Sequence, residues 1–299
     1  MPNYILSNSL PEYKSREEYV DWELNYHFMQ TNFLSFGSSR LSYSCWGTGD
    51  KLLLCFHGYG ESAASFSFLE SSFGQEFTIL AIDMPFHGET EWEEGLFFDP
   101  VDLQAIVKKV VSSSPGFRKG WWLLGYSMGG RVALQLLELM PDKIERLVLV
   151  APDGLKVNGW YWLATQTGWG NWLFRWTMQH PGWFFLILRA GNKLGLVNRS
   201  VYKFTFNYIG DWLVRNDLYK RWTTMRAFRP DMKAIRSLIL EKGIPVRLLY
   251  GQYDRIIRWE TGEKFRQRIE PYGRLEIAPA GHQLLHVKHI DELAALMKA

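Results

Sequence analysis

The sequence predicts an α/β fold, a doubly wound and mostly parallel sheet with helices on both faces and one helical insertion. From Lys51 onward, short apolar runs alternate with longer runs of helical spacing. Continuous apolar runs of this kind are typical of parallel strands that are buried on both faces. The alternation stops after Ala151 and resumes at Gly243, which indicates that a single segment interrupts the core. The β-α-β-α order implies right-handed crossovers.

The first predicted elements are two antiparallel strands at the sheet edge, Asn32–Phe36 and Arg40–Trp46. Further strands are expected at Leu52–Phe56, Thr78–Ile82, Trp121–Leu124, Arg146–Val150, Pro245–Tyr250 and Arg274–Ile277. Helices are expected at Glu61–Phe73, Asp99–Ser113, Met128–Met140, Glu260–Ile269 and Leu284–Met297. An additional helix is expected at residues 11–25. The predicted organisation is therefore an N-terminal helical extension (1–30), a core (31–151 and 231–299) and a helical insertion (152–230).

Composition narrows the class of protein. Hydrophobic residues make up 47% of the 299 residues and charged residues 22%, as in ordinary soluble globular proteins. A net charge of +3 is too small to indicate nucleic-acid binding. The N-terminus lacks the apolar region of a signal peptide, and no run of about 18 apolar residues predicts a transmembrane segment. Cys45 and Cys55 suggest neither a metal site nor a disulfide framework, so a cytoplasmic location is expected.

A sharp turn is predicted at residues 125–130, with the sequence GYSMGG, between the strand Trp121–Leu124 and the next helix. This is the G-x-S-x-G arrangement in its required context. Gly125 and Gly129 lack a Cβ, so chain can pass close on both sides while Ser127 takes a strained conformation with its hydroxyl projecting. The helix N-terminus behind Ser127 favours developing negative charge. Ser127 is therefore the candidate nucleophile.

An oxyanion hole is expected in the loop at residues 57–60, with the sequence HGYG. Acyl transfer needs two backbone N–H groups aimed at the oxyanion, and one comes from the residue after the nucleophile, Met128. We expect the other from the N–H of Tyr59, with Gly58 allowing the backbone to turn its amides inward. His57 is expected to support this loop and not to carry a proton.

The candidate general base is His282, which follows the last predicted strand at the carboxyl edge of the sheet, where Ser127 also lies. Its imidazole titrates near neutral pH, so it can accept the serine proton and return it to the leaving group. His286 and His289 are expected within the closing helix, with no catalytic part.

The carboxylate that orients this histidine is expected to be Asp254, just past the strand Pro245–Tyr250. The order Ser127, Asp254, His282 along the chain is the one expected for this architecture. Asp153 is the competing candidate because it also follows a predicted strand. We favour Asp254, since a glycine, a turn and an aspartate after the penultimate strand is the usual arrangement.

Four segments together resemble the α/β-hydrolase superfamily, in its serine-nucleophile branch. They are residues 57–60 (HGYG), 125–130 (GYSMGG), 251–254 (GQYD) and 281–282 (GH). A fifth segment, DMPFHG at residues 83–88, is similar to the family's D-x-P-G-x-G loop, with Phe86 in place of the usual glycine. The resemblance covers residues 31–151 and 243–299. For the insertion, the resemblance concerns only its place in the chain, because members of this family commonly carry a helical lid after the sixth strand.

The resemblance implies an eight-stranded, mostly parallel sheet and a two-step mechanism. Ser127 attacks a carbonyl carbon, the Tyr59 and Met128 amides hold the oxyanion, and His282 protonates the leaving group. Water activated by His282 then releases the acyl enzyme. No cofactor or metal is needed. Relatives that cleave epoxides or carbon–halogen bonds use an aspartate nucleophile, so a serine at this position argues against both reactions.

The composition of the insertion bears on the substrate. Residues 153–229 contain eight of the fourteen tryptophans, and eleven Lys and Arg against three Asp and no Glu. An aromatic, basic cover favours a small-molecule substrate with an apolar acyl or aromatic group and an anionic end. It would also suit transient docking on an anionic membrane face. A helical core rich in tryptophan with a solvated basic face is the alternative interpretation.

Three functions are compatible with these motifs. The leading hypothesis is hydrolysis of an ester or thioester of an apolar acyl compound. The second is a carbon–carbon hydrolase or a menaquinone-pathway-type lyase with the same triad, and the run GYSMGGR, ending at Arg131, is similar to that lyase. The third is a catalytically silent small-molecule sensor. Such proteins typically lose a triad member or the oxyanion loop, whereas this sequence keeps both.

Overall fold

The computed structural model describes residues 31–113, 120–156, 158–197, 202, 205–206 and 209–298. These residues form an eight-stranded sheet in the order β1-β2-β4-β3-β5-β6-β7-β8, in which β2 runs antiparallel to its neighbours β1 and β4 and all other neighbouring strands are parallel. The strands are β1 Thr31–Phe36, β2 Ser39–Trp46, β3 Lys51–Phe56, β4 Phe77–Ile82, β5 Trp121–Tyr126, β6 Ile144–Val150, β7 Val246–Gly251 and β8 Gly273–Ala278. The predicted fold class is confirmed. The helix expected at residues 11–25 lies outside the described residues.

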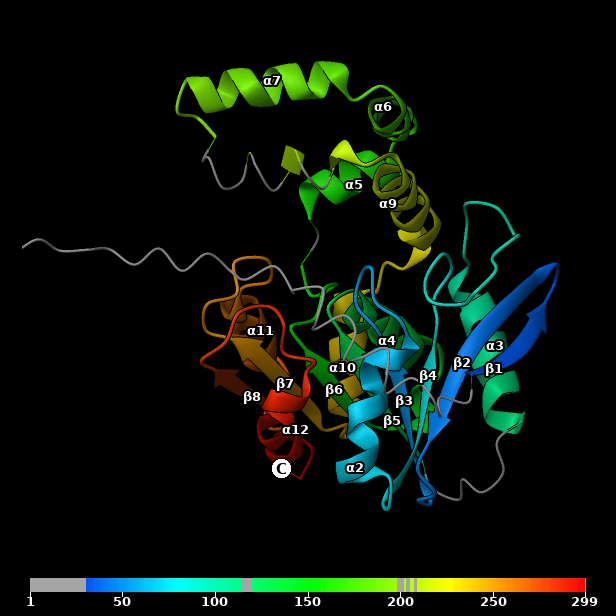
Figure 1. The fold of residues 1–299 in the computed structure, drawn as a ribbon. Helices are drawn as coiled ribbons and strands as arrows, with labels where there is room; N and C mark the ends of the chain where they lie inside the picture. The colour runs from blue at the N-terminus through cyan, green and yellow to red at the C-terminus, as the bar shows by residue number, and fades with distance from the viewer. Residues whose placement is uncertain are drawn as a thin grey trace, which may run out of the picture.

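Helices cover both faces of the sheet (Figure 1). One face packs against α3 (Pro100–Ser113), α4 (Met128–Leu139), α10 (Met232–Lys242) and α11 (Trp259–Arg266). The other packs against the 3-10 helix η2 (Ala63–Leu69), α2 (Glu70–Phe73) and α12 (Ile290–Lys298). Strand β3 shows why both faces are covered: Leu54 belongs to the first cluster and Leu53 to the second, and both are fully buried. A strand that is apolar on both sides needs a hydrophobic layer on each.

The helix expected at Glu61–Phe73 forms, but most of it is a 3-10 helix and not an α-helix. Ala63–Leu69 forms a 3-10 helix, and α-helix is confined to Glu70–Phe73. Ala63, Phe66 and Leu69 are the buried residues of η2. Their spacing of three residues places them on one side of a helix with three residues per turn, which is the 3-10 geometry.

The last two helices are shorter than predicted. The helix expected at Glu260–Ile269 ends at Arg266, and the one expected at Leu284–Met297 begins as α-helix at Ile290, after the short 3-10 helix η5 (Val287–His289). His286 therefore precedes the closing helix, and its ring accepts a hydrogen bond from the N–H of Lys288 at 3.2 Å. Leu284 and Leu285 are buried without helical backbone, so their apolar pattern reflects core packing alone.

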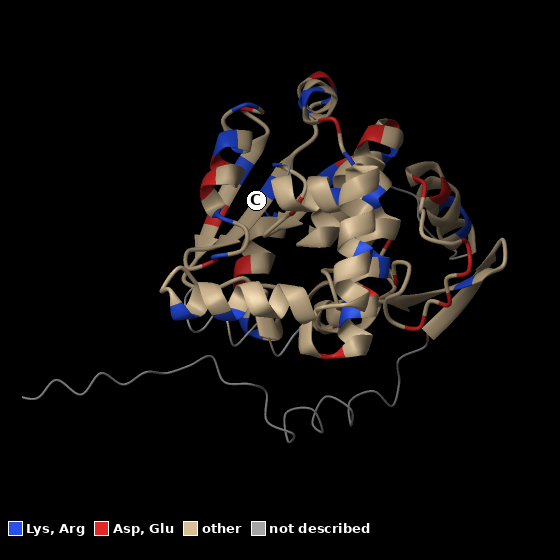
Figure 2. Ribbon diagram, turned by 90° about the horizontal axis from the view of Figure 1, so that it is seen from above, with Lys and Arg blue, Asp and Glu red and all other residues tan. Residues whose placement is uncertain are grey.

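Four α-helices occur among the described residues of the segment 152–230 and are called the inserted helices below. They are α5 (Gly159–Gln166), α6 (Gly168–Gln179), α7 (Gly182–Lys193) and α9 (Trp212–Thr224). Side chains of Asn158, Thr167 and Asp211 accept backbone N–H groups at the starts of α5, α6 and α9, as N-caps do. Figure 2 looks down on these helices and shows Lys and Arg segments along them.

The inserted helices are attached to the core through the end of α9. Arg221 Nε donates to the carbonyl oxygen of Phe86 at 2.8 Å, and a terminal nitrogen of Arg226 donates to that of Leu96 at 2.7 Å. The N–H of Phe98 donates to the carbonyl of Thr224 at 3.0 Å. Helix α7, by contrast, lies at the top of Figure 1, away from the sheet.

None of the helices in the described ranges is both long enough and apolar enough to cross a bilayer.

Candidate active site

Ser127 sits on the tight turn between β5 and α4, with φ 49° and ψ −116°. Its N–H donates to the carbonyl oxygen of Val150 at 3.0 Å, and its own carbonyl accepts from Gly130 and Asp153. Hydrogen bonds on both sides therefore hold the Ser127 backbone at a positive φ, a conformation that residues other than glycine rarely adopt. A Cβ on Gly129 would lie 1.9 Å from the Phe56 carbonyl oxygen, so glycine is required for α4 to approach β3.

The structure brings Ser127, His282 and Asp254 into one hydrogen-bonded chain. Ser127 Oγ lies 3.0 Å from His282 Nε2, and His282 Nδ1 lies 2.7 Å from Asp254 Oδ2. The other carboxylate oxygen of Asp254 accepts the N–H groups of Ile256 and Ile257, at 2.7 and 3.0 Å. The Asp254 side chain is fully buried. A carboxylate held in this way fixes the histidine with Nδ1 protonated and Nε2 free to accept the serine proton.

The loops that carry His282 and Asp254 meet at Gly251. A Cβ at this position would lie 2.1 Å from the carbonyl oxygen of Gly281. The N–H of Tyr253 donates to the carbonyl oxygen of Ala280 at 2.9 Å, which joins the same two loops. Close backbone packing thus sets the separation of the two side chains.

Asp153 does not contact His282. Its Oδ2 lies 2.7 Å from a terminal nitrogen of Arg131, and its Oδ1 accepts the N–H of Gly154. The Arg131 guanidinium also lies 4.4 Å from the ring centroid of Tyr161. Asp153, the competing candidate for the orienting carboxylate, is therefore part of a separate ion pair with Arg131.

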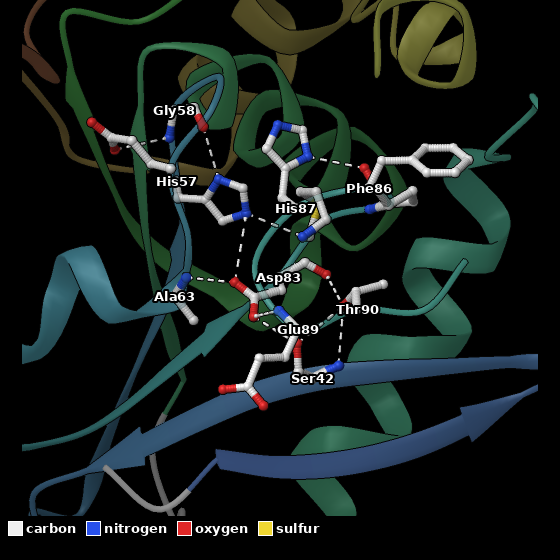
Figure 3. A network of polar contacts seen from close by, with 12 residues as sticks. Ser42, His57, Gly58, Ala63, Asp83, Phe86, His87, Glu89 and Thr90 are labelled. Atoms are coloured by element: carbon white, nitrogen blue, oxygen red, sulfur yellow. Dashed lines mark hydrogen bonds and ion pairs between the residues drawn. The ribbon is translucent and has the colours of Figure 1, made fainter. Parts of the chain in front are cut away.

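His57, the first residue of the loop at residues 57–60, has a buried side chain (Figure 3). Its Nδ1 lies 2.8 Å from the Gly58 carbonyl oxygen, and its Nε2 accepts the N–H of Met84 at 3.1 Å. One ring nitrogen must therefore donate and the other accept, which describes a neutral imidazole. Burial lowers the pKa of His57 and keeps the ring in this state. His57 touches the loop backbone and not Ser127, as expected of a supporting residue.

Tyr59 and Met128, the expected oxyanion donors, both line the cavity that contains Ser127. Met128 is the first residue of α4, where backbone N–H groups have no acceptor within the helix. Next to this loop, a Cβ on Gly58 would lie 3.0 Å from the ring of Tyr126. The close fit of Gly58 against Tyr126 positions the loop beside the serine turn.

Tyr126 is a site residue that the sequence motifs do not predict. Its hydroxyl donates to the carbonyl oxygen of His282 at 3.1 Å, and its ring lies 5.6 Å from the His282 ring. Burial raises the pKa of Tyr126 well above its usual range, so the hydroxyl keeps its proton and remains a donor. The residue before the nucleophile thus positions the general-base candidate, which no local pattern could reveal.

Asp83 organises the loop at residues 83–88. Its carboxylate accepts the Ser42 hydroxyl at 2.6 Å, the Ala63 N–H at 2.6 Å and the Glu89 N–H at 3.2 Å (Figure 3). Gly88 lies against this carboxylate with φ 52°, where any Cβ would clash. Phe86, the departure from the family pattern, has φ 63°. A non-glycine residue thus occupies the left-handed conformation that glycine adopts most easily.

A cavity of about 790 Å³ opens above Ser127, between the core and α9. Its apolar lining includes Leu218, Trp222 and Met225. Its charged lining is mostly basic: Arg131, Lys156, Arg221 and Arg258, against Asp153. A second cavity of about 540 Å³ shares several of these lining residues. The space next to Ser127 is large enough for a small organic molecule.

Comparison with known proteins gives a family match and partial relatives. The model of the alpha/beta hydrolase family matches residues 52–296. A pimeloyl-[acyl-carrier protein] methyl ester esterase of Klebsiella pneumoniae is 30% identical over 105 residues, which are 35% of this chain and 38% of that protein. The corresponding Salmonella newport esterase is 28% identical over 109 residues, 36% of this chain and 40% of that protein. The matched segment thus spans about two fifths of these relatives.

Solved structures match over most of the chain at low identity. The thioesterase domain from the curacin biosynthetic pathway has a TM-score of 0.59 and 16% identity, covering 91% of this chain and 100% of that one. A probable hydrolytic enzyme from Pseudomonas aeruginosa has a TM-score of 0.63 and 18% identity, covering 90% and 94%. A bromoperoxidase from Bacillus anthracis has a TM-score of 0.60 and 18% identity, covering 90% and 100%. At such identities the likeness concerns the fold.

Proposed function

Because the chain belongs to the alpha/beta hydrolase family, we propose that it is a serine hydrolase that cleaves an ester or thioester of an apolar acyl compound. The observation that carries the proposal is the chain of contacts from Ser127 Oγ to His282 Nε2, at 3.0 Å, and from His282 Nδ1 to Asp254 Oδ2, at 2.7 Å. A nucleophile within hydrogen-bond reach of a base, itself oriented by a carboxylate, is the arrangement that activates a serine hydroxyl.

The proposed reaction follows from these contacts. His282 takes the proton of Ser127 as its Oγ forms a bond to the substrate carbonyl carbon, and the carbonyl oxygen becomes an oxyanion between the N–H groups of Tyr59 and Met128. His282 then gives the proton to the leaving alcohol or thiol, and the bond to the acyl carbon breaks. Water deprotonated by His282 attacks the acyl enzyme, and Ser127 recovers its proton.

We further propose that residues 152–230 act as a lid over the core formed by residues 31–151 and 231–299. Leu218, Arg221 and Trp222 of α9 line the Ser127 cavity, so the insertion contributes directly to the substrate pocket. The basic lining favours a substrate whose apolar body ends in an anionic group.

The first test is turnover of chromogenic esters and acyl thioesters, from acetyl to palmitoyl, by the wild type and by Ser127→Ala. Loss of the nucleophile should lower kcat by about 10⁴-fold or more. Ser112→Ala is the matched control, because Ser112 is exposed on α3 and bonds to its own helix at Lys109. Wild-type turnover that survives in Ser127→Ala would contradict the proposed nucleophile.

Carbon–carbon hydrolysis with the same three residues is the second candidate, and the cationic lining favours it. Lys156, Arg221 and Arg258 surround the cavity, and an anionic ring-cleavage product would place its carboxylate among them. Turnover of such acids without turnover of any ester would select this function. A wild type that is inactive on both classes would contradict both enzymatic functions and favour a silent sensor.

A further inference from the structure

Helix α6 carries tryptophans on its outward face. Trp169, Trp172 and Trp176 are spaced by three and four residues, so they lie on one side of the helix. Trp169 and Trp172 are exposed by 62% and 64% and Trp176 by 38%. The buried residues of the same helix are Gly170, Thr177 and Met178. The helix thus packs Phe174 inward against Tyr219 and Trp222 of α9 and also carries three tryptophans outward, where polar residues are usual.

The outward tryptophans continue onto α7. The rings of Trp172 and Trp176 stack with centroids 6.3 Å apart, and Trp176 stacks on Trp183 of α7 at 5.8 Å. On α7, Leu186 and Ile187 are exposed by 65% and 60%, whereas Leu188 is buried. We call these residues the α6–α7 face: the tryptophan stack joins the two helices, and Leu186 and Ile187 follow Trp183 by three and four residues on the same side of α7. A contiguous exposed apolar patch on a globular protein marks an interaction surface.

The charges beside this face are all of one sign. No Asp or Glu occurs from Gly154 to Gly210, a stretch that contains six Lys and Arg. On α7, Arg189 and Lys193 follow Leu186 by three and seven residues and so lie on its side of the helix. Neither α6 nor α7 contains Asp or Glu, and Figure 2 colours the Lys and Arg segments of the ribbon blue.

We propose that the α6–α7 face docks on an anionic phospholipid surface. Tryptophan suits the boundary between headgroups and acyl chains, where its ring is partly apolar and its N–H stays polar, and Lys and Arg bind the anionic headgroups. A second copy of this chain would bring like charges together across the interface. An acidic protein partner would leave the central tryptophans without apolar counterparts. An anionic lipid surface offers apolar acyl chains to the tryptophans and negative headgroups to the Lys and Arg side chains.

Vesicle sedimentation with the full chain tests this proposal. The protein should sediment with phosphatidylcholine vesicles that contain about a third phosphatidylserine, and much less with phosphatidylcholine alone. The double variant Trp172→Ser and Trp176→Ser should bind at least about tenfold more weakly. The double variant Arg189→Gln and Lys193→Gln should lose roughly fivefold per charge on the anionic vesicles.

Matched controls remove apolar side chains and positive charges from other parts of the molecule. The pair Phe33→Ser and Val287→Ser removes exposed apolar side chains of the core, and the pair Lys233→Gln and Arg236→Gln removes charges from α10. Both should bind vesicles as the wild type does. Thermal unfolding of every variant checks that the fold is intact.

Three results would overturn the proposal: no binding to anionic vesicles, an equal loss in the controls, or a dimer that the tryptophan variants dissociate while vesicles are not bound. Docking requires no catalysis, so Ser127→Ala should bind vesicles like the wild type. Vesicle binding by a wild type that hydrolyses nothing would therefore contradict the proposed function and leave the docking proposal standing.

Discussion

Phe86 shows how a single residue can carry backbone strain at the edge of a site. Its φ of 63° lies in the left-handed region, which costs an ordinary residue roughly 1–2 kcal/mol. Two contacts hold it there: its carbonyl oxygen accepts from Arg221 Nε, and Lys220 Nζ lies 5.4 Å from the centroid of its ring. Both partners belong to α9. The strained residue is therefore one of the points at which the inserted helices meet the core.

Comparing Phe86→Gly with Phe86→Ala isolates this strain. Both variants remove the ring, but glycine alone relieves the left-handed conformation. We expect the glycine variant to be more stable than the alanine variant by about 1 kcal/mol, measured as the free energy of unfolding in urea. An alanine variant as stable as the glycine variant would show that the backbone relaxes at this position.

His87 is buried beside His57, with ring centroids 5.0 Å apart. Its Nδ1 lies 2.9 Å from the Pro85 carbonyl oxygen. Burial, with smaller contributions from His57 and Arg221, lowers the pKa of His87 well below its ordinary value of 6.5. The folded chain therefore keeps His87 neutral at a pH where the unfolded chain protonates it.

This difference predicts a loss of stability in mild acid. Above about pH 6.5 both states leave His87 neutral, and the stability is complete. As the pH falls below 6.5 the unfolded state binds the extra proton, so the free energy of unfolding should decline by about 1.4 kcal/mol per pH unit for this histidine. Urea unfolding from pH 8 to pH 5 measures the slope.

In His87→Asn, the free energy of unfolding should fall less steeply with decreasing pH, by the contribution of one histidine. The asparagine amide can replace Nδ1 as a hydrogen-bond donor, and it does not titrate. His286→Asn is the control. His286 is exposed and caps η5, a place that asparagine also suits. An unchanged slope in His87→Asn would assign the acid sensitivity to other groups.

At the scale of elements, the site depends on how closely α4 approaches β3. The Cβ of any residue at 129 would overlap the carbonyl oxygen of Phe56, and one at 125 would lie 2.5 Å from the carbonyl oxygen of Gly129. Met128, at the start of α4, and Tyr59, in the loop after β3, both line the Ser127 cavity. The geometry of the proposed oxyanion donors is thus set by packing between a helix and a strand.

Gly129→Ala should therefore destabilise the fold by about 3 kcal/mol or more, because backbone atoms must separate to admit the methyl group. Gly159→Ala in α5 is the matched control, since a Cβ there meets no atom within 4 Å. Its effect should stay within about 1 kcal/mol. Thermal unfolding of the two variants measures the difference, and similar transition temperatures would refute the close-packing argument.

At the scale of the whole molecule, the sheet was predictable because its strands are continuous apolar runs with helical segments between them. Ala63–Leu69 lies within a predicted helix, but a spacing of three residues between apolar side chains suits both the α and the 3-10 form, so the sequence does not set the helix type. The positions of Ser127, Asp254 and His282 at strand ends follow from the sequence, and their catalytic roles stay predictions. Tyr126 could not be anticipated, because its partner lies 156 residues away.

Strands β6 and β7 are hydrogen-bonded neighbours, with Leu147 opposite Val246 and Val150 opposite Leu249. Because parallel neighbours need a crossover, α10 returns the chain between them, and the two ends of the insertion, at Asp153 and at Arg229, both line one cavity. The entropy lost on closing such a loop grows only with the logarithm of its length, by about 0.6 kcal/mol for each doubling. The insertion can consequently lengthen, shorten or be exchanged at little cost to the sheet. The insertion residues that line the cavity and the hydrogen-bonded serine thus lie in separate stretches of chain, so that one stretch can change while the other is kept.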